Sequence, residues 1–194
     1  MKKVFRILLI IFLIFIGILV YPIISYLLWQ KQFQSQIPNM SCVSNLTELL
    51  PLDEKFKGFV MSEDQNTFIE LSTNETLSLL QSTDIISGGE VTNICIAPNS
   101  AVWSIYAKLS LQGINIPWVR LDIAKDTMET AQLYVSNIFV GNILVPEKIT
   151  ENIKTQLNKG ISDALVLVNE NNFLGRKIQN IELLNDKIVV KGTL

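Results

Sequence analysis

Histidine is missing from this chain of 194 residues, and with it the commonest general base and the commonest metal ligand of proteins. Charged residues make up only 18%, against 48% hydrophobic residues. The two cysteines, Cys42 and Cys95, are too few for a zinc site without histidine. The densest acidic stretch, Ser62-Glu63-Asp64, is typical of a solvated loop. We therefore expect no catalytic residues, no cofactor and no metal, and a protein that is not an enzyme.

The few charges are spread unevenly, and none lies between Ile7 and Trp29. This run of 23 residues is long enough, at about 1.5 Å per residue in a helix, to cross the hydrocarbon core of a bilayer. Tyr21, Tyr26 and Trp29 gather at its far end, as the aromatic residues of a membrane interface do. The run predicts one transmembrane helix, residues 7–29.

The basic residues set the expected orientation. Lys2, Lys3 and Arg6 precede the run without any acidic residue, which places residues 1–6 in the cytoplasm by the positive-inside rule. The rest of the chain has 13 basic and 18 acidic residues and therefore carries a net charge of −5. We expect a single-pass protein of the cell membrane with an extracytoplasmic domain that has no electrostatic reason to bind nucleic acid.

Two other interpretations of the N-terminal run stay open. A cleaved signal peptide has a shorter apolar core and ends in a small-x-small site, whereas this run ends in Tyr26-Leu27-Leu28-Trp29. A lipoprotein would be modified at Cys42, but Cys42 lies 12 residues beyond Gln30, and Asn39 stands where an aliphatic residue is expected.

Residues 30–43 are rich in glutamine and serine and are predicted to be a linker, followed by a domain over residues 44–194. Ser72 and Glu75 form a capping box that opens a helix. Period-two alternation predicts strands from Val91 to Val140, with a bulge at Pro117-Trp118, and a terminal hairpin turns at Asn185-Asp186.

The strongest helix signal follows Pro146, where aliphatic residues recur every four positions. These residues are Ile149, Ile153, Leu157, Ile161 and Leu165. The expected fold class is α+β: an N-terminal transmembrane helix, then a curved antiparallel sheet packed on a long amphipathic helix. Outside the cytoplasm, Cys42 and Cys95 either pair in a disulfide or are two unrelated small residues.

Two short motifs carry a family resemblance. The stretch with Gly113, Ile116 and Pro117 and the stretch with Gly141, Leu144 and Pro146 resemble the "G-x-x-I-P" and "l-G-x-l-x-l-P" motifs of the YpmS-like family of small membrane-anchored extracytoplasmic bacterial proteins. That family's shape is similar to tubular lipid-binding domains. The resemblance therefore implies contact with lipid, by analogy of fold.

We expect an apolar groove between the long helix and the concave face of the sheet. Its candidate lining is Trp103, Ile105, Leu109, Leu111, Ile153 and Leu157. The expected partners are the lipid bilayer and a lipid ligand in this groove. The alternative is a module without a ligand pocket that binds a protein of the cell envelope.

Overall fold

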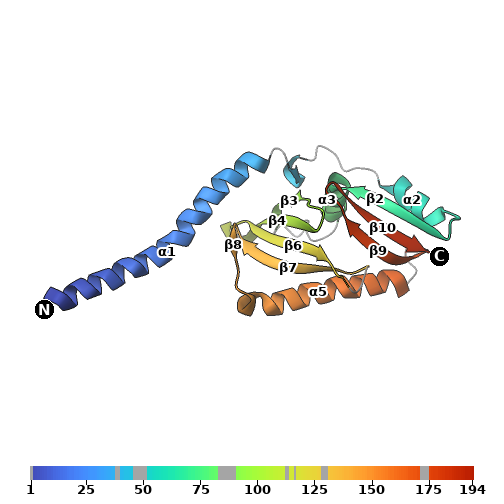
Figure 1. Ribbon diagram of the computed structural model, residues 1–194. Coiled ribbons are helices and arrows are strands. Elements are labelled where there is room, and N and C mark those ends of the chain that lie inside the picture. Colours follow the sequence, from blue (N-terminus) through green and yellow to red (C-terminus); the bar gives the residue numbers. More distant parts are fainter. Residues whose placement is uncertain are drawn as a thin grey trace.

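A long helix leads into a body of two antiparallel sheets in the computed structural model, which describes residues 2–37, 40–45, 52–82, 91–111, 114–115, 117–127, 131–170 and 175–194. The helix, α1 (Lys2–Gln36), projects from one end of the body, and a second long helix, α5 (Glu147–Glu170), runs along the body beside both sheets (Figure 1). This arrangement confirms the predicted α+β class with an apolar N-terminal helix and a sheet packed with a C-terminal helix.

The larger sheet lies nearer to α1 and has the strand order β1-β3-β4-β6-β7-β8, with β5 paired to β4. Its strands are β1 (Ser41–Cys42), β3 (Val91–Ala97), β4 (Val102–Leu111), β5 (Ile114–Asn115), β6 (Val119–Lys125), β7 (Leu133–Val140) and β8 (Ile143–Leu144). The smaller sheet has the order β2-β10-β9, formed by β2 (Asn66–Ser72), β10 (Lys187–Thr193) and β9 (Lys177–Leu183). The shorter helices are η2 (Val43–Asn45), α2 (Asp53–Met61) and α3 (Thr73–Ser82).

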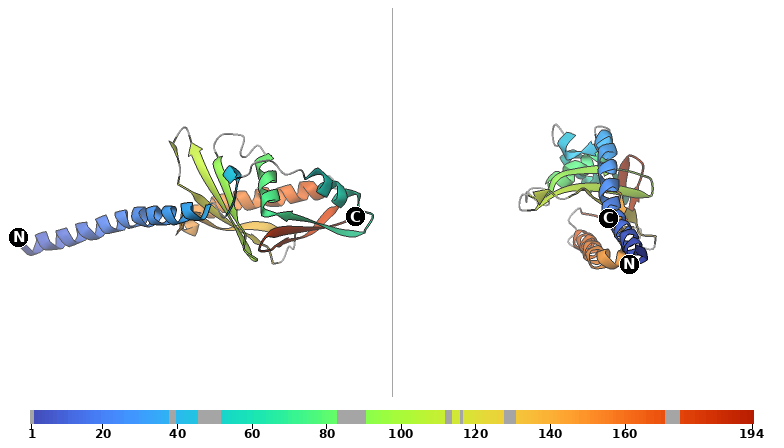
Figure 2. Two further views of the ribbon diagram at one scale, coloured as in Figure 1. Left: turned by 90° about the horizontal axis from the view of Figure 1, so that it is seen from above. Right: turned by 90° about the vertical axis from the view of Figure 1, so that its left-hand side faces the viewer.

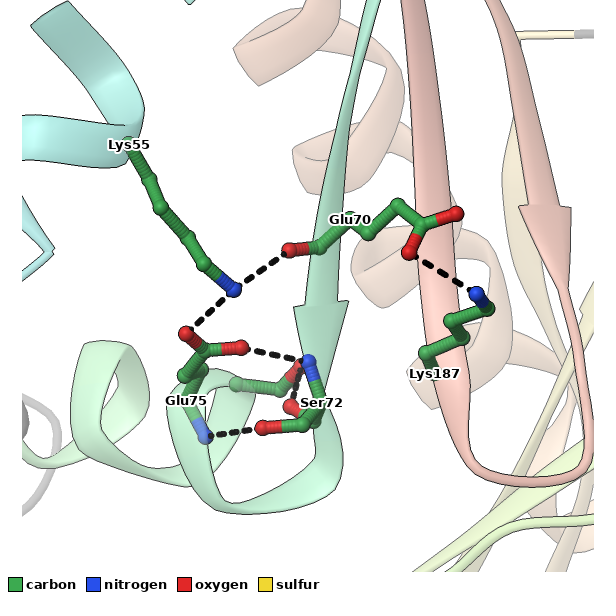
Figure 3. A network of polar contacts seen from close by, with 6 residues as sticks. Lys55, Glu70, Ser72, Glu75 and Lys187 are labelled. Carbon is green, nitrogen blue, oxygen red and sulfur yellow. Dashed lines mark hydrogen bonds and ion pairs between the residues drawn. The ribbon is translucent and has the colours of Figure 1, made fainter. Parts of the chain in front are cut away.

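The predicted capping box is present at the start of α3. The backbone N–H of Glu75 donates to the Ser72 hydroxyl at 3.3 Å, and the backbone N–H of Ser72 donates to the Glu75 carboxylate at 2.8 Å. Lys55 of α2 reaches the same carboxylate and the Glu70 carbonyl oxygen, so the cap also ties α2 to β2 and α3 (Figure 3). Satisfying the free N–H groups at the helix start explains why α3 begins here.

Trp103 joins the two sheets in the centre of the body. Its ring is buried in a cluster with Leu77, Ile94, Ile96 and Leu183, and its Nε1–H donates to the Leu184 carbonyl oxygen at 2.8 Å. A buried indole N–H needs such a partner. The contact places the end of β9 against the middle of the larger sheet.

The residues predicted as a linker are largely ordered into the fold, which corrects that expectation. Helix α1 continues to Gln36, and Ser41 and Cys42 pair with Ile96 and Cys95 of β3. The reason is that Phe33 is buried against the sheet in a hydrophobic cluster. The composition of the stretch does not predict this burial. The domain is therefore built directly onto the end of α1.

A second difference concerns the predicted bulge at Pro117-Trp118. The structure divides the expected strand there into β5 and β6, which pair with separate parts of β4. The bulges of the larger sheet within the described residues lie elsewhere, at Val91/Asn93 and at Asp122/Ile123. Proline has no N–H to donate, and here it ends the ladder instead of bending it.

Candidate functional site

The apolar part of α1 is long enough and apolar enough to cross a membrane. Within the described residues it covers Ile10–Gln36, with a mean hydropathy of 2.6 and no part of the most apolar window buried. Pro22 lies inside the helix. Figure 2 shows that the N-terminal part of α1 extends away from both sheets, whereas Ser25, Tyr26, Trp29 and Phe33 contact the domain.

An aromatic cluster fastens the end of α1 to the larger sheet. The Phe33 ring packs on Tyr106 at 4.6 Å and edge-on to Trp118 at 5.1 Å between ring centroids, and it stacks on Trp29 at 4.8 Å. Aromatic pairs at these separations add to the free energy gained by burial. The junction between α1 and the domain is thus a packed core.

The disulfide lies in the same cluster. Cys42 and Cys95 are bonded to each other, and both are buried beside Phe33, Tyr106 and Trp118. Of the two alternatives that the sequence left open for these cysteines, the structure has the disulfide. It links β1, just after α1, to the central part of the larger sheet.

The long helix α5 is oriented differently from the sequence-based expectation. Ile149, Ile153 and Leu157 are exposed, at 66%, 52% and 37%, instead of packing on the sheet. The side chain of Asn158 faces the sheet in their place. Its amide oxygen accepts from the Val135 N–H at 2.7 Å, and its amide nitrogen donates to the Val135 carbonyl oxygen at 3.4 Å. The free edge of β7 needs partners for its backbone groups, and Asn158 supplies both.

The exposed stripe of α5 is one apolar surface of the body, and one face of the larger sheet is another. Cross-strand partners place aliphatic residues in rows on one face of the sheet. One row is Ile96, Ile105, Leu121 and Ile138, and the next is Ile94, Ala107, Val119 and Val140, which continues to Ile143 of β8. Several of these side chains, including Ile105 and Leu121, are only half-buried.

The opposite face of the sheet carries Tyr106 and Cys95 of the aromatic cluster and, next to them, polar side chains. Asp122 accepts from the Ser104 hydroxyl at 2.8 Å and pairs with Arg120, whose guanidinium lies over the Phe139 ring. Glu147 and Lys154 of α5 border a shallow hollow with Asn137, the cross-strand partner of Asp122. Ile138 and Leu144 line the same hollow, and none of the stripe residues Ile149, Ile153 and Leu157 does.

The six residues predicted to line a groove have different surroundings. Trp103 is buried in the core, Ile105 and Leu109 are half-buried on the aliphatic face, and Ile153 and Leu157 lie exposed on α5. The side chain of Leu111 lies outside the described part of the structure, as do Gly113 and Ile116 of the family motif. The three described hollows, of about 530, 300 and 230 Å³, contain none of these six residues.

The carboxylates with shifted pKa values, Glu75 and Glu182, belong to hydrogen-bonded pairs that stabilise the fold. Burial raises the pKa of Glu75, but the hydrogen bonds from Lys55 and Ser72 outweigh it and hold that pKa below its ordinary value. The hydrogen bond from Lys191 likewise lowers the pKa of Glu182. These carboxylates cap a helix or pair across strands, and no cluster of three metal-ligating side chains occurs among the residues described.

Sequence reasoning did not predict that four aliphatic side chains at the end of the sheet next to α1 stay exposed. Val140, Ile143 and Leu144 surround the turn between β7 and β8, and Ile149 lies in the first turns of α5. The Gly141–Pro146 motif marked this turn, but only the packing shows that its apolar neighbours stay uncovered.

Comparisons of the chain with family models, with curated proteins and with solved structures gave no match. The candidate site consists of a helix apolar enough to span a membrane, packed at its end on an α+β body, and of two apolar surfaces, the exposed stripe of α5 and the half-buried aliphatic face of the sheet.

Proposed function

We propose that this is a single-pass membrane protein of the YpmS-like kind, with the N-terminus in the cytoplasm and residues 44–194 outside, and that its domain binds an acyl chain of a membrane lipid. In this proposal the acyl chain of the lipid lies between the exposed stripe of α5 and the aliphatic face of the sheet. The protein acts by binding, without catalysis. The observation that carries the proposal is the exposure of Ile153 and Leu157 in a body whose sheet also has a half-buried aliphatic face.

The energetics support binding without any polar contact. Each buried methylene contributes about 0.8 kcal/mol, so part of one acyl chain is enough for measurable affinity after the cost of ordering it. An exposed aliphatic row of this kind is unusual on a surface that faces water alone. The disulfide and the acidic charge of residues outside the span both fit an extracytoplasmic domain.

Position along α5 separates lipid binding from simple contact with the bilayer. Leu157 lies eight residues beyond Ile149, which is about 12 Å further along the helix. Figure 1 shows that α5 leads away from the side where α1 enters the body. A lipid chain that reaches Leu157 has therefore left the plane of the bilayer.

The test is photocrosslinking with the full-length chain in phospholipid vesicles. A phosphatidylglycerol with a diazirine in the middle of one acyl chain is activated by light, and the modified peptides are mapped by mass spectrometry. We expect adducts on the α5 peptide that contains Leu157 and on the β4 peptide that contains Leu109. Leu157→Asp should remove the α5 adducts, whereas Phe68→Asp on β2, also an exposed apolar residue, should leave them unchanged.

Adducts confined to α1 and its immediate surroundings would refute acyl-chain binding. The alternative, a module that binds an envelope protein, would then account for the exposed stripe. Protease added to spheroplasts tests the orientation separately, because complete protection of the domain would contradict an extracytoplasmic location.

A further inference from the structure

Four exposed aliphatic side chains lie around one turn at the end of the body from which α1 departs, with Val140 and Ile143 on one face of the β7–β8 hairpin and Leu144 on the other. This turn patch consists of Val140, Ile143, Leu144 and Ile149, and its most exposed members are Leu144 at 53% and Ile149 at 66%. Exposed apolar side chains gathered in one place mark a contact surface rather than ordinary solvent-facing residues.

The turn patch is held directly against α1. Asn142 donates from its side-chain amide to the Ser25 hydroxyl at 3.3 Å, and the Trp118 N–H donates to the Tyr26 hydroxyl at 3.2 Å. Gly141 has a φ of +62°, and a Cβ placed there would lie 2.6 Å from Cδ2 of Tyr26. Only glycine permits both this backbone conformation and this close approach.

These contacts fix the height of the patch relative to a membrane. Tyr26 and Trp29 end the uncharged run of α1, where interfacial aromatic residues are found at the boundary of the bilayer. Because the β7–β8 turn touches α1 at Ser25 and Tyr26, it lies at the same depth. Figure 1 shows β8 next to this part of α1, with α5 beginning on the far side of β8.

We infer that the turn patch is inserted into the surface of the same bilayer that α1 spans. The occupant of this surface is phospholipid, since the patch continues the apolar surface of the anchor and lies at the level of its interfacial aromatic residues. The domain is thus seated on the membrane at a fixed orientation, with α5 rising from it. In this orientation the aliphatic sheet row ending at Val140 and Ile143 opens toward lipid. The inference rests on the anchoring part of the proposed function and is independent of acyl-chain binding.

The test places one additional tryptophan at a time in the full-length chain, reconstituted in nanodiscs of phosphatidylcholine and phosphatidylglycerol with or without bromine on the acyl chains. Bromine quenches indole emission only at contact distance. Leu144→Trp reports on the turn patch, and Ile149→Trp is a second reporter should the first variant fail to fold by circular dichroism. Phe68→Trp, at 59% exposure of the native residue, is the matched control at the opposite end of the body. Emission of the wild type, which includes Trp29, is subtracted.

We expect the added emission of Leu144→Trp and of Ile149→Trp to shift to the blue and to lose most of its intensity in brominated nanodiscs. The added emission of Phe68→Trp should keep its intensity. Equal quenching of the patch reporters and the Phe68 control would overturn the inference. A wild-type chain that does not co-elute with the nanodiscs would overturn the anchoring itself, and so distinguishes the two failures.

Discussion

Two neighbouring residues of α5 give opposite expectations under the two descriptions of this helix. If the aliphatic stripe were core, Leu157→Ala would cost about 2–5 kcal/mol of stability. With Leu157 at 37% exposure, no cavity forms. Three carbon atoms worth about 0.8 kcal/mol each then lose only part of their burial, so we expect about 1 kcal/mol.

Asn158→Ala should cost more than Leu157→Ala. The substitution leaves both backbone groups of Val135 without their partners at 2.7 and 3.4 Å, and Val135 itself is buried. An unsatisfied buried polar group costs about 1–3 kcal/mol, and the longer bond is the weaker one, so we expect a loss of about 3 kcal/mol. Asn158→Asp keeps the acceptor for the Val135 N–H but not the donor, and should fall between wild type and Asn158→Ala.

The assay is urea unfolding of the full-length chain in detergent micelles, followed by near-UV circular dichroism, which reports on the packed aromatic residues. Hydrogen exchange of the Val135 amide gives a local readout and should become faster in Asn158→Ala but not in Leu157→Ala. A larger loss of stability for Leu157→Ala than for Asn158→Ala would refute the orientation of α5 and restore the helix to the packing expected from its periodicity.

Three further predictions concern the body of the domain. Arg176 is fully buried and donates to the carbonyl oxygens of Phe59, Ser62 and Gln65 at the end of α2, so Arg176→Met should cost about 3 kcal/mol in the same unfolding assay, and a cost under 1 kcal/mol would contradict this role. Reduction of the disulfide, which spans 53 residues, should lower stability by about 4 kcal/mol in the chain-entropy model, and a transition unmoved by reductant would contradict that expectation. The lowered pKa of Glu75 stabilises the fold above the ordinary glutamate pKa of 4.5. Its advantage over Glu75→Gln should therefore be complete above that pH and shrink as the pH falls through the lower folded pKa, and a constant difference across pH 3–7 would refute it.

Local signals in the sequence were sufficient for the elements that depend on local physics. The uncharged run from Ile7 to Trp29 predicts α1, because a long apolar helix needs only its own backbone hydrogen bonds. The Ser72–Glu75 capping box predicts the start of α3 for the same kind of reason, since both partners lie within one turn. Alternation along β3, β4 and β6 predicts which residues share a face, because side chains alternate with period two.

The same periodicity misled for α5. The repeat of aliphatic residues every four positions predicts that one flank of α5 is aliphatic. It does not predict whether the sheet, lipid or water lies against that flank. The open edge of β7 decided it, because the unpaired backbone groups of Val135 are satisfied by Asn158 on the adjacent flank. That choice turns Ile153 and Leu157 outward, and it depends on where the edge of the sheet lies in space.

The junction between α1 and the domain was decided in the same way. A glutamine- and serine-rich stretch resembles a linker in composition, yet Phe33 lies against Tyr106 and Trp118, which are 73 and 85 residues away along the chain. Gly141 approaches Tyr26 from an equally distant part of the sequence. By itself the sequence determines that this protein has an N-terminal helix apolar enough to span a membrane and an α+β fold. The position of the turn patch next to α1 comes from contacts that only the folded chain brings together, because burial between distant segments has no local pattern.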